Sequence, residues 1–150
     1  VLAEPANAAL LSSGVAQTRS DDGAPTAGHS AFEPHPIQGW TPDFIPLVLQ
    51  EATDRGLYDE VVKVAGPDGI KWARELARRE GIFCGISAGA TFAVARSIAE
   101  SAPAGCTILC MLPDTGERYL STPLFEGITE EMDDAEWALS RSTPGACFAA

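Results

Sequence analysis

The chain has 150 residues, 45% of them hydrophobic, and its 10 basic against 21 acidic side chains give a formal net charge of -11. This charge would repel a phosphate backbone, and no apolar run approaches the ~20 residues of a membrane span, so neither nucleic acid nor a membrane is an expected partner. The N-terminus lacks the basic flank and apolar centre of a signal peptide, which predicts a cytoplasmic protein. Because Val1 is not an initiator methionine, we expect this chain to be part of a longer parent protein. An organelle is the alternative location, if a targeting peptide was lost upstream of Val1.

The first half of the chain predicts short elements and one irregular insertion. Residues 1–3 are an expected strand that Pro5 breaks. From 15 to 34 the composition changes to Ser, Asp, Gly, Ala and Pro without periodicity, which predicts a flexible surface insertion. A short helix is expected over 47–55, and a strand over 60–64.

Two longer helices follow. The first is expected over 67–80, where apolar residues recur on one stripe and a glycine stops the helix. After a short strand at 82–84, the second is expected over about 87–100, and its many alanines allow close packing. The strand expected over 107–112 is apolar on both faces, as in a parallel sheet covered by helices. This order of elements predicts an α/β fold with a parallel sheet in three layers, and helices on both faces.

A polar turn follows that last strand. Pro113 and Gly116 allow the chain to turn at the carboxyl end of the strand, where α/β proteins bind ligands. The polar groups of the turn, among them Asp114 and Thr115, are therefore expected to face a binding crevice.

Four segments of the chain carry a family pattern: Glu4-Pro5-Ala6-Asn7, His35 to Pro46, Gly85 to Ala90, and Pro113 to Thr122. Together they resemble the C-terminal part of cysteine synthase, also called O-acetylserine sulfhydrylase or O-acetylserine (thiol)-lyase, a pyridoxal-phosphate enzyme of fold type II. The resemblance covers about residues 1 to 14 and 34 to 128. It divides the chain into the start of this enzyme region at 1–14, the insertion at 15–34, the main α/β region at 35–128 and an acidic tail at 129–150.

The resemblance implies a cofactor, a reaction and binding residues. Thr115 occupies the position where the family sets a hydroxyl against the pyridine nitrogen of pyridoxal phosphate. Asp114 is the alternative, because a change of loop direction would aim its carboxylate at the ring. Gln38 and Gly39 lie in the loop that flanks the substrate, and Gly39 would also let backbone approach the cofactor. The implied reaction makes L-cysteine from O-acetyl-L-serine and sulfide, in a parent enzyme expected to be a homodimer.

The family's Schiff-base lysine and phosphate-binding loop are missing from this chain. Its lysines, Lys63 and Lys71, fall on a predicted strand and a predicted helix, outside any such motif. We therefore expect no catalytic residue in the chain, and a chain that is inactive alone. The alternatives are a cystathionine β-synthase-like β-replacement enzyme and a non-catalytic interaction fragment.

Gly85 to Gly89 also matches the G-x-S-x-G nucleophile elbow of serine hydrolases, with Ser87 as the nucleophile. In that fold the catalytic histidine follows the serine, whereas His29 and His35 both precede it. A hydrolase is thus the least favoured function, and Ser87 is expected to cap the helix. No metal site is expected, because neither histidine is spaced from a cysteine like a zinc ligand.

The remaining residues of the polar turn are expected to be structural. Glu117 and Arg118 are predicted to form an ion pair, and Tyr119 an aromatic plug that holds the turn presenting Thr115. His35 is predicted to be a hydrogen-bonding loop residue.

Overall fold

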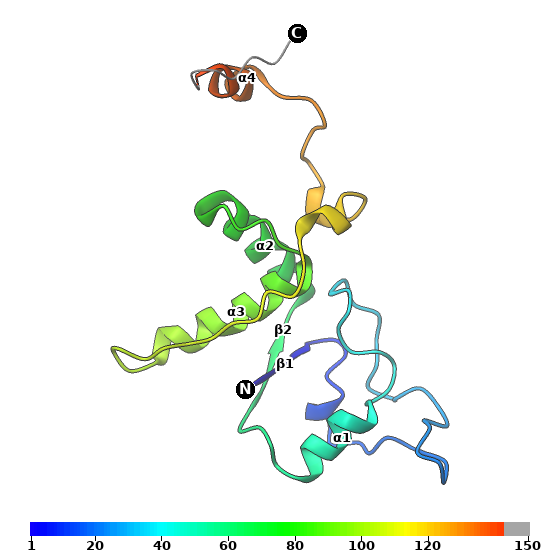
Figure 1. The fold of residues 1–150 in the computed structure, drawn as a ribbon. Coiled ribbons are helices and arrows are strands. Elements are labelled where there is room, and N and C mark those ends of the chain that lie inside the picture. The colour runs from blue at the N-terminus through cyan, green and yellow to red at the C-terminus, as the bar shows by residue number, and fades with distance from the viewer. Residues whose placement is uncertain (143–150) are drawn as a thin grey trace.

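The structure is a computed structural model, and it describes residues 1–142. Its regular elements, in chain order, are β1 (Leu2–Pro5), η1 (Leu11–Ser13), α1 (Leu47–Asp54), β2 (Val61–Val64), α2 (Gly66–Glu80), α3 (Ile86–Ser101), η2 (Gly116–Tyr119), η3 (Pro123–Phe125) and α4 (Asp134–Arg141). The expected helices therefore form with ends shifted by a residue or two (Figure 1). Residues 143–150 of the expected acidic tail, with Cys147, lie outside the described part.

The sheet in the described residues has two parallel strands, β1 and β2, which pair from Leu2 opposite Val61 to Pro5 opposite Val64. Pro5 is tolerated because it stands at the end of the strand, where it needs to donate no ladder hydrogen bond. Helix α3 packs against both strands and against α2, so the two long helices and the sheet enclose the main core.

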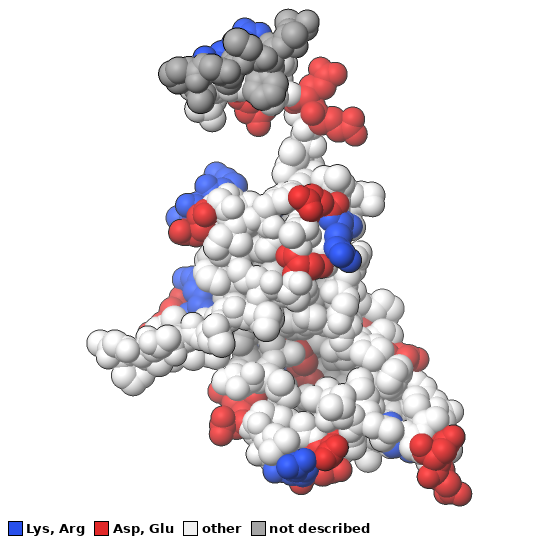
Figure 2. All heavy atoms as spheres, in the orientation of Figure 1, with Lys and Arg blue, Asp and Glu red and all other residues white. Residues whose placement is uncertain are grey.

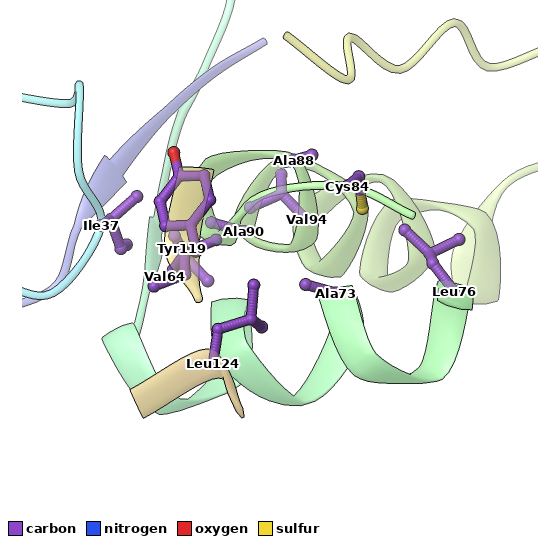
Figure 3. Packing of buried hydrophobic residues seen from close by; sticks show 11 residues of the cluster. Ile37, Val64, Ala73, Leu76, Cys84, Ala88, Ala90, Val94, Tyr119 and Leu124 are labelled. Carbon is purple, nitrogen blue, oxygen red and sulfur yellow. The ribbon is translucent and has the colours of Figure 1, made fainter. Parts of the chain in front are cut away.

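The main core is built mostly from small and branched apolar side chains of these elements. Its buried members are Ile37, Val64, Ala73, Leu76, Cys84, Ile86, Ala88, Ala90, Val94, Tyr119 and Leu124. Figure 3 shows the Tyr119 ring within this cluster, near Ile37 and Val64. The 3-10 turns after residue 115 thus belong to the core, which fixes the polar turn in space.

Arg74 ties the second of these turns to α2. Its guanidinium donates to the carbonyl oxygens of Leu124 at 2.7 Å, Pro123 at 2.9 Å and Glu126 at 2.8 Å. One side chain thus satisfies the carbonyls of Leu124 and Glu126 and adds a second donor to that of Pro123, which also accepts from the backbone N–H of Glu126 at 3.2 Å. These bonds hold η3 against the helix.

Two expected strands do not form. Residues 107–112 have no regular secondary structure and join no sheet in the described chain, and Leu109 is 97% exposed. The stretch 82–84 contributes only an isolated antiparallel bridge between Cys84 and Thr115. Apolar residues alone do not make a strand, because each strand needs a neighbour to pair its backbone groups. Residues 107–110 instead line a groove with the start of β1 and one side of α3, unpaired with β1.

The insertion at 15–34 carries hydrogen bonds to the loop before α1. Gln17 donates to the carbonyl of Ala27 at 2.9 Å and accepts from the backbone N–H of Ile45 at 3.1 Å. Arg19 donates to the carbonyls of Gly23 and Ile45. These contacts give the insertion a defined path, and its predicted flexibility stays a prediction.

Charge on one face of the described residues is spread out rather than gathered in one patch. On the face shown in Figure 2, basic side chains stand singly or in small groups among acidic ones. Across residues 1–142, no helix combines the length and the apolar character that crossing a membrane requires.

Candidate functional site

Three segments that are far apart in the sequence line one hollow of about 890 Å³, here called the central hollow. The loop 38–40, the first turns of α3 and the stretch 111–119 form its wall. The lining residues are Gln38, Gly39, Trp40, Ser87, Thr91, Met111, Pro113, Asp114, Arg118 and Tyr119. Most of the residues that the sequence singled out are therefore brought together at one place.

A hydrogen bond between Tyr119 and Asp114 organises the floor of the central hollow. The Tyr119 hydroxyl donates to Oδ2 of Asp114 at 2.7 Å, and Tyr119 is only 4% exposed. The other oxygen, Oδ1 of Asp114, is buried and has no hydrogen-bond partner among the described residues. This oxygen is enclosed by protein atoms, among them those of Gly85, and does not open onto the central hollow.

Gly85 makes this arrangement possible. A Cβ on Gly85 would overlap both Oδ1 of Asp114 and the ring of Tyr119, so only glycine fits there. The Gly85 N–H also donates to the carbonyl of Asp114 at 3.3 Å. The carboxylate is thus packed against the residue that precedes α3.

Burial raises the pKa of the Tyr119 phenol above its ordinary value. The hydrogen bond to Asp114 and the negative charge of that carboxylate raise the pKa further, while Ser87 and Arg118 act in the opposite direction. At neutral pH the phenol therefore keeps its proton and donates to Asp114.

The N-terminus of α3 lies at the hollow. The N-cap residue is Gly85, without a side-chain cap, so the prediction that Ser87 caps the helix is wrong. Ser87 is instead buried in the first turn, because the helix begins at Ile86. The free N–H groups of this turn give the site a partial positive charge that favours the nearby carboxylate.

The loop with Gln38 and Gly39 is anchored by Ile37, which is fully buried. Gly39 has φ +84°, a left-handed conformation that glycine adopts without strain, and open space stands where its Cβ would be. The glycine is therefore required by backbone conformation rather than by a crowded contact. Gln38 is exposed on the wall, and His35 contacts the carbonyl of Thr41 at 3.1 Å, consistent with a loop hydrogen-bonder.

Thr115 is not among the residues that line the central hollow. Its hydroxyl donates to Oε2 of Glu117 at 2.8 Å, and its side chain is exposed. Its predicted contact with a cofactor stays a prediction. The expected ion pair between Glu117 and Arg118 is absent from the described residues, because Glu117 accepts from Thr115 instead.

Two other sequence features lie away from the hollow. The carboxylate of Glu4 is buried and accepts from the backbone N–H groups of Leu11 at 3.0 Å and Ser12 at 3.2 Å, which is a structural role. Lys63 and Lys71 are exposed and absent from the lining.

Sequence reasoning missed Thr91 and Met111 on the wall. Thr91 stands one helical turn after Ser87 and donates to its carbonyl at 2.9 Å, so the helical period would have placed both on one face. Met111 carried no such signal, since its stretch was expected to be covered on both sides.

The family model described as "Pyridoxal-phosphate dependent enzyme" matches residues 1–114. O-ureido-L-serine synthase of Streptomyces lavendulae is 48% identical over 143 residues, which are 95% of this chain and 38% of that protein. Cysteine synthase of Staphylococcus aureus (strain N315) is 40% identical over 92 residues, 61% of this chain and 28% of the relative. The chain thus spans less than two fifths of the length of these relatives.

The comparison with solved structures finds enzymes of the same kinds. A crystal structure of O-ureido-L-serine synthase matches with a TM-score of 0.70 at 48% identity, over 92% of this chain and 37% of the other. Cysteine synthase from Entamoeba histolytica matches with a TM-score of 0.65 at 32% identity, over 87% of this chain and 33% of the other. The predicted fold class and the resemblance are both confirmed, and so is the cofactor of the family.

Proposed function

Because the chain belongs to the family of pyridoxal-phosphate dependent enzymes, we propose that it is the C-terminal portion of an enzyme that replaces a substituent on the β-carbon of a serine derivative. The observation that carries this proposal is the convergence of the Gln38–Trp40 loop, the start of α3 and the turn around Asp114 on the central hollow. These are the segments whose sequences resemble cysteine synthase.

The leading reaction makes L-cysteine. Acetate leaves the β-carbon of O-acetyl-L-serine with the electrons of the C–O bond, and sulfide forms the new C–S bond at the same carbon. The second candidate reaction makes O-ureido-L-serine. It is favoured by the 48% identity to O-ureido-L-serine synthase over 95% of this chain, against 40% over 61% for the cysteine synthase.

The hollow fits part of such a cofactor. A volume of about 890 Å³ is more than enough for a substituted pyridine ring, and the lining combines the polar side chains of Gln38 and Asp114 with the ring of Trp40. Bound pyridoxal phosphate supplies an electron sink for the pair left at the substrate's α-carbon when its proton is removed.

In this proposal the chain's own residues bind and orient the substrate and the cofactor. The Gln38 amide has both a donor and an acceptor on the wall, which suits the amino-acid part of a substrate. The backbone at Gly39 would approach substrate and cofactor, and the turn with Thr115 would support the ring. Tyr119 keeps the Asp114 carboxylate in place through their hydrogen bond.

A family enzyme binds its cofactor through a lysine, and neither Lys63 nor Lys71 lines the hollow. The chain alone is therefore proposed to be inactive, and the complete enzyme is proposed to be a cytoplasmic homodimer. The rival functions remain a cystathionine β-synthase-like enzyme and a non-catalytic interaction fragment. A hydrolase has little support, because neither His29 nor His35 is among the residues that line the hollow with Ser87.

Co-expression tests the proposal. The chain is produced with the portion of O-ureido-L-serine synthase that it does not match, and is supplied with pyridoxal phosphate, O-acetyl-L-serine and either sulfide or hydroxyurea. We expect mass spectrometry to detect L-cysteine or O-ureido-L-serine only when both pieces are present. Binding of the pieces without turnover of either mixture would instead support the interaction fragment.

A variant in the central hollow and a control variant outside it test whether substrate binding takes place there. Gln38→Ala is expected to raise KM roughly tenfold through loss of substrate hydrogen bonds, whereas Gln50→Ala on α1 leaves KM unchanged. For the isolated chain, borohydride trapping of the cofactor on Lys63 or Lys71 would contradict its proposed inactivity. Labelling of Ser87 by a fluorophosphonate would revive the hydrolase.

A further inference from the structure

The groove that residues 107–110 line with the start of β1 and one side of α3 is here called the β1 groove. We propose that it binds a β-strand from the portion of the parent enzyme that this chain lacks. This inference rests on the function proposed above, in which the chain is one portion of a longer enzyme. It identifies the surface through which the two portions join.

One wall of the β1 groove is the free edge of β1. Leu2 donates its N–H to the carbonyl of Glu60 at 2.9 Å. Ala6 donates in the same way to Val64 at 2.9 Å. Bonds to one neighbouring strand come from alternate residues, so Ala3 directs its N–H and C=O away from β2, and Ala3 lines the groove. The strand therefore presents backbone groups to the groove that no other described segment pairs.

The opposite wall is the stretch 107–112, drawn in yellow along α3 in Figure 1. Its N–H and C=O groups make no backbone hydrogen bond within the described part of the chain. Its side chains are mostly apolar, and Leu109 is 97% exposed and Met111 71% exposed. Apolar side chains together with unpaired backbone groups are what a strand has before its neighbours are in place.

A strand is the occupant that satisfies both walls. A helix uses its N–H and C=O groups within itself, and a small ligand has too few of them to match two rows of backbone. A strand carries donors and acceptors on both edges, so it pairs with β1 on one side and with 107–112 on the other. Because α3 supplies Val94, Ala95 and Ile98 to the groove, the side chains that the strand turns toward α3 should be apolar.

A second copy of this chain is a poorer source of this strand. Its free edge is β1, which has four residues and ends at Pro5, a residue without an N–H to donate. Short edge strands that contain proline resist pairing with other chains. The chain spans less than two fifths of the length of its relatives, so most of the polypeptide of such an enzyme is left to supply the strand.

Pairing in the β1 groove would also fix one wall of the central hollow. Met111, Pro113 and Asp114 line that hollow, and they continue directly from the stretch that forms the groove. A strand bonded to both 107–112 and β1 would hold these residues at a set distance from the sheet. Association of the two portions and the shape of the central hollow are thus coupled.

Hydrogen exchange tests the inference. The full chain is mixed with the portion of O-ureido-L-serine synthase that it does not match, produced separately, and exchange is followed by mass spectrometry of peptides. We expect the amides of 107–112 to exchange rapidly in the chain alone and at least roughly tenfold more slowly in the mixture, while those of α1 change little. Turnover of O-acetyl-L-serine with sulfide or hydroxyurea is measured in the same mixture.

Two leucine variants form a matched pair. Leu109 lines the β1 groove, whereas Leu139 lies on α4, and both are exposed, at 97% and 73%. Leu109→Asp is expected to weaken association at least roughly tenfold, because the bound strand would cover this side chain. Leu139→Asp should change it less than about twofold. Circular dichroism of each variant alone checks that the fold is kept, as their exposure predicts.

The outcomes separate this inference from the proposed function. Association with turnover but without slower exchange in 107–112 would overturn the inference and leave the function standing, as would equal effects of the two variants. Slower exchange without turnover would support the inference and count against the function. Slower exchange in the chain alone at raised concentration would show that a second copy fills the groove. No association of the two portions would overturn both.

Discussion

Gly89 on α3 lies directly against the backbone of Gly69 on α2. A Cβ on Gly89 would overlap the carbonyl oxygen of Gly69 and the backbone nitrogen of Ala73, and these backbone atoms cannot turn aside as a side chain can. The close approach of the two helices, which sets the position of the α3 N-terminus at the central hollow, depends on this pair.

Gly89→Ala is therefore expected to destabilise the protein, although alanine is the better helix former. Forcing α2 and α3 apart disturbs a packed core and costs about 1–3 kcal/mol of the free energy of unfolding. Urea unfolding followed by circular dichroism measures the loss. Ala99→Ser, at an exposed position of the same helix, is the control, and an unchanged midpoint for Gly89→Ala would contradict the observed packing.

Arg74→Ala is expected to lower the free energy of unfolding by about 1–3 kcal/mol, because the carbonyl oxygens of Leu124 and Glu126 lose their donor and that of Pro123 keeps only the Glu126 N–H. Arg78→Ala is the matched control. Arg78 lies one turn further along α2, is 79% exposed on its side chain and makes only a 3.4 Å ion pair with Glu75, so its removal should change little. Equal losses for the two variants would show that Arg74 does not hold η3.

The Tyr119 phenol is expected to titrate above the ordinary pKa of tyrosine, since burial and the Asp114 carboxylate both raise its pKa. A raised pKa stabilises the fold fully below the ordinary phenol pKa, and the contribution is lost as pH rises through the folded value. Absorbance at alkaline pH measures this in a Tyr58→Phe background, where Tyr119 is the remaining tyrosine. Adding Asp114→Asn should lower the pKa, and an unchanged titration would contradict the hydrogen bond.

Cys84 is expected to resist thiol reagents in the folded protein, and Cys106 to react before Cys84. Cys84 is 4% exposed, and burial followed by the charge of Asp114 raises its pKa, so little thiolate is present at neutral pH. Cys106 is exposed. Alkylation at neutral pH with peptide mass spectrometry compares the two sites, and urea should abolish the difference. Equal rates before unfolding would contradict the burial of Cys84.

The helices followed from local sequence. The apolar stripe of α2, its proline in the first turn and Gly81 after its end are local signals, and the helix forms within a residue of the predicted range. The small residues of α3 also predicted close packing, although only the structure identified Gly69 as the residue that meets Gly89. Helix patterns are read from neighbours along the chain, which is why sequence sufficed for them.

Strands and side-chain directions depended on distant partners. Residues 107–112 have the composition of a buried strand, yet nothing in the described chain pairs with them, and composition carries no information about a partner. The turn after them shows the same limit: the sequence identified Asp114 and Thr115 as the candidates.

The sequence by itself determined the family pattern, the long helices and the residues from which a site could be built. Tertiary structure decided that Asp114 faces the central hollow while Thr115 turns to Glu117, because Gly85 and Tyr119 pack against the carboxylate from parts of the chain on either side of α3. Helical periodicity is a property of a few consecutive residues. The direction of a side chain in a turn is set by what packs against it.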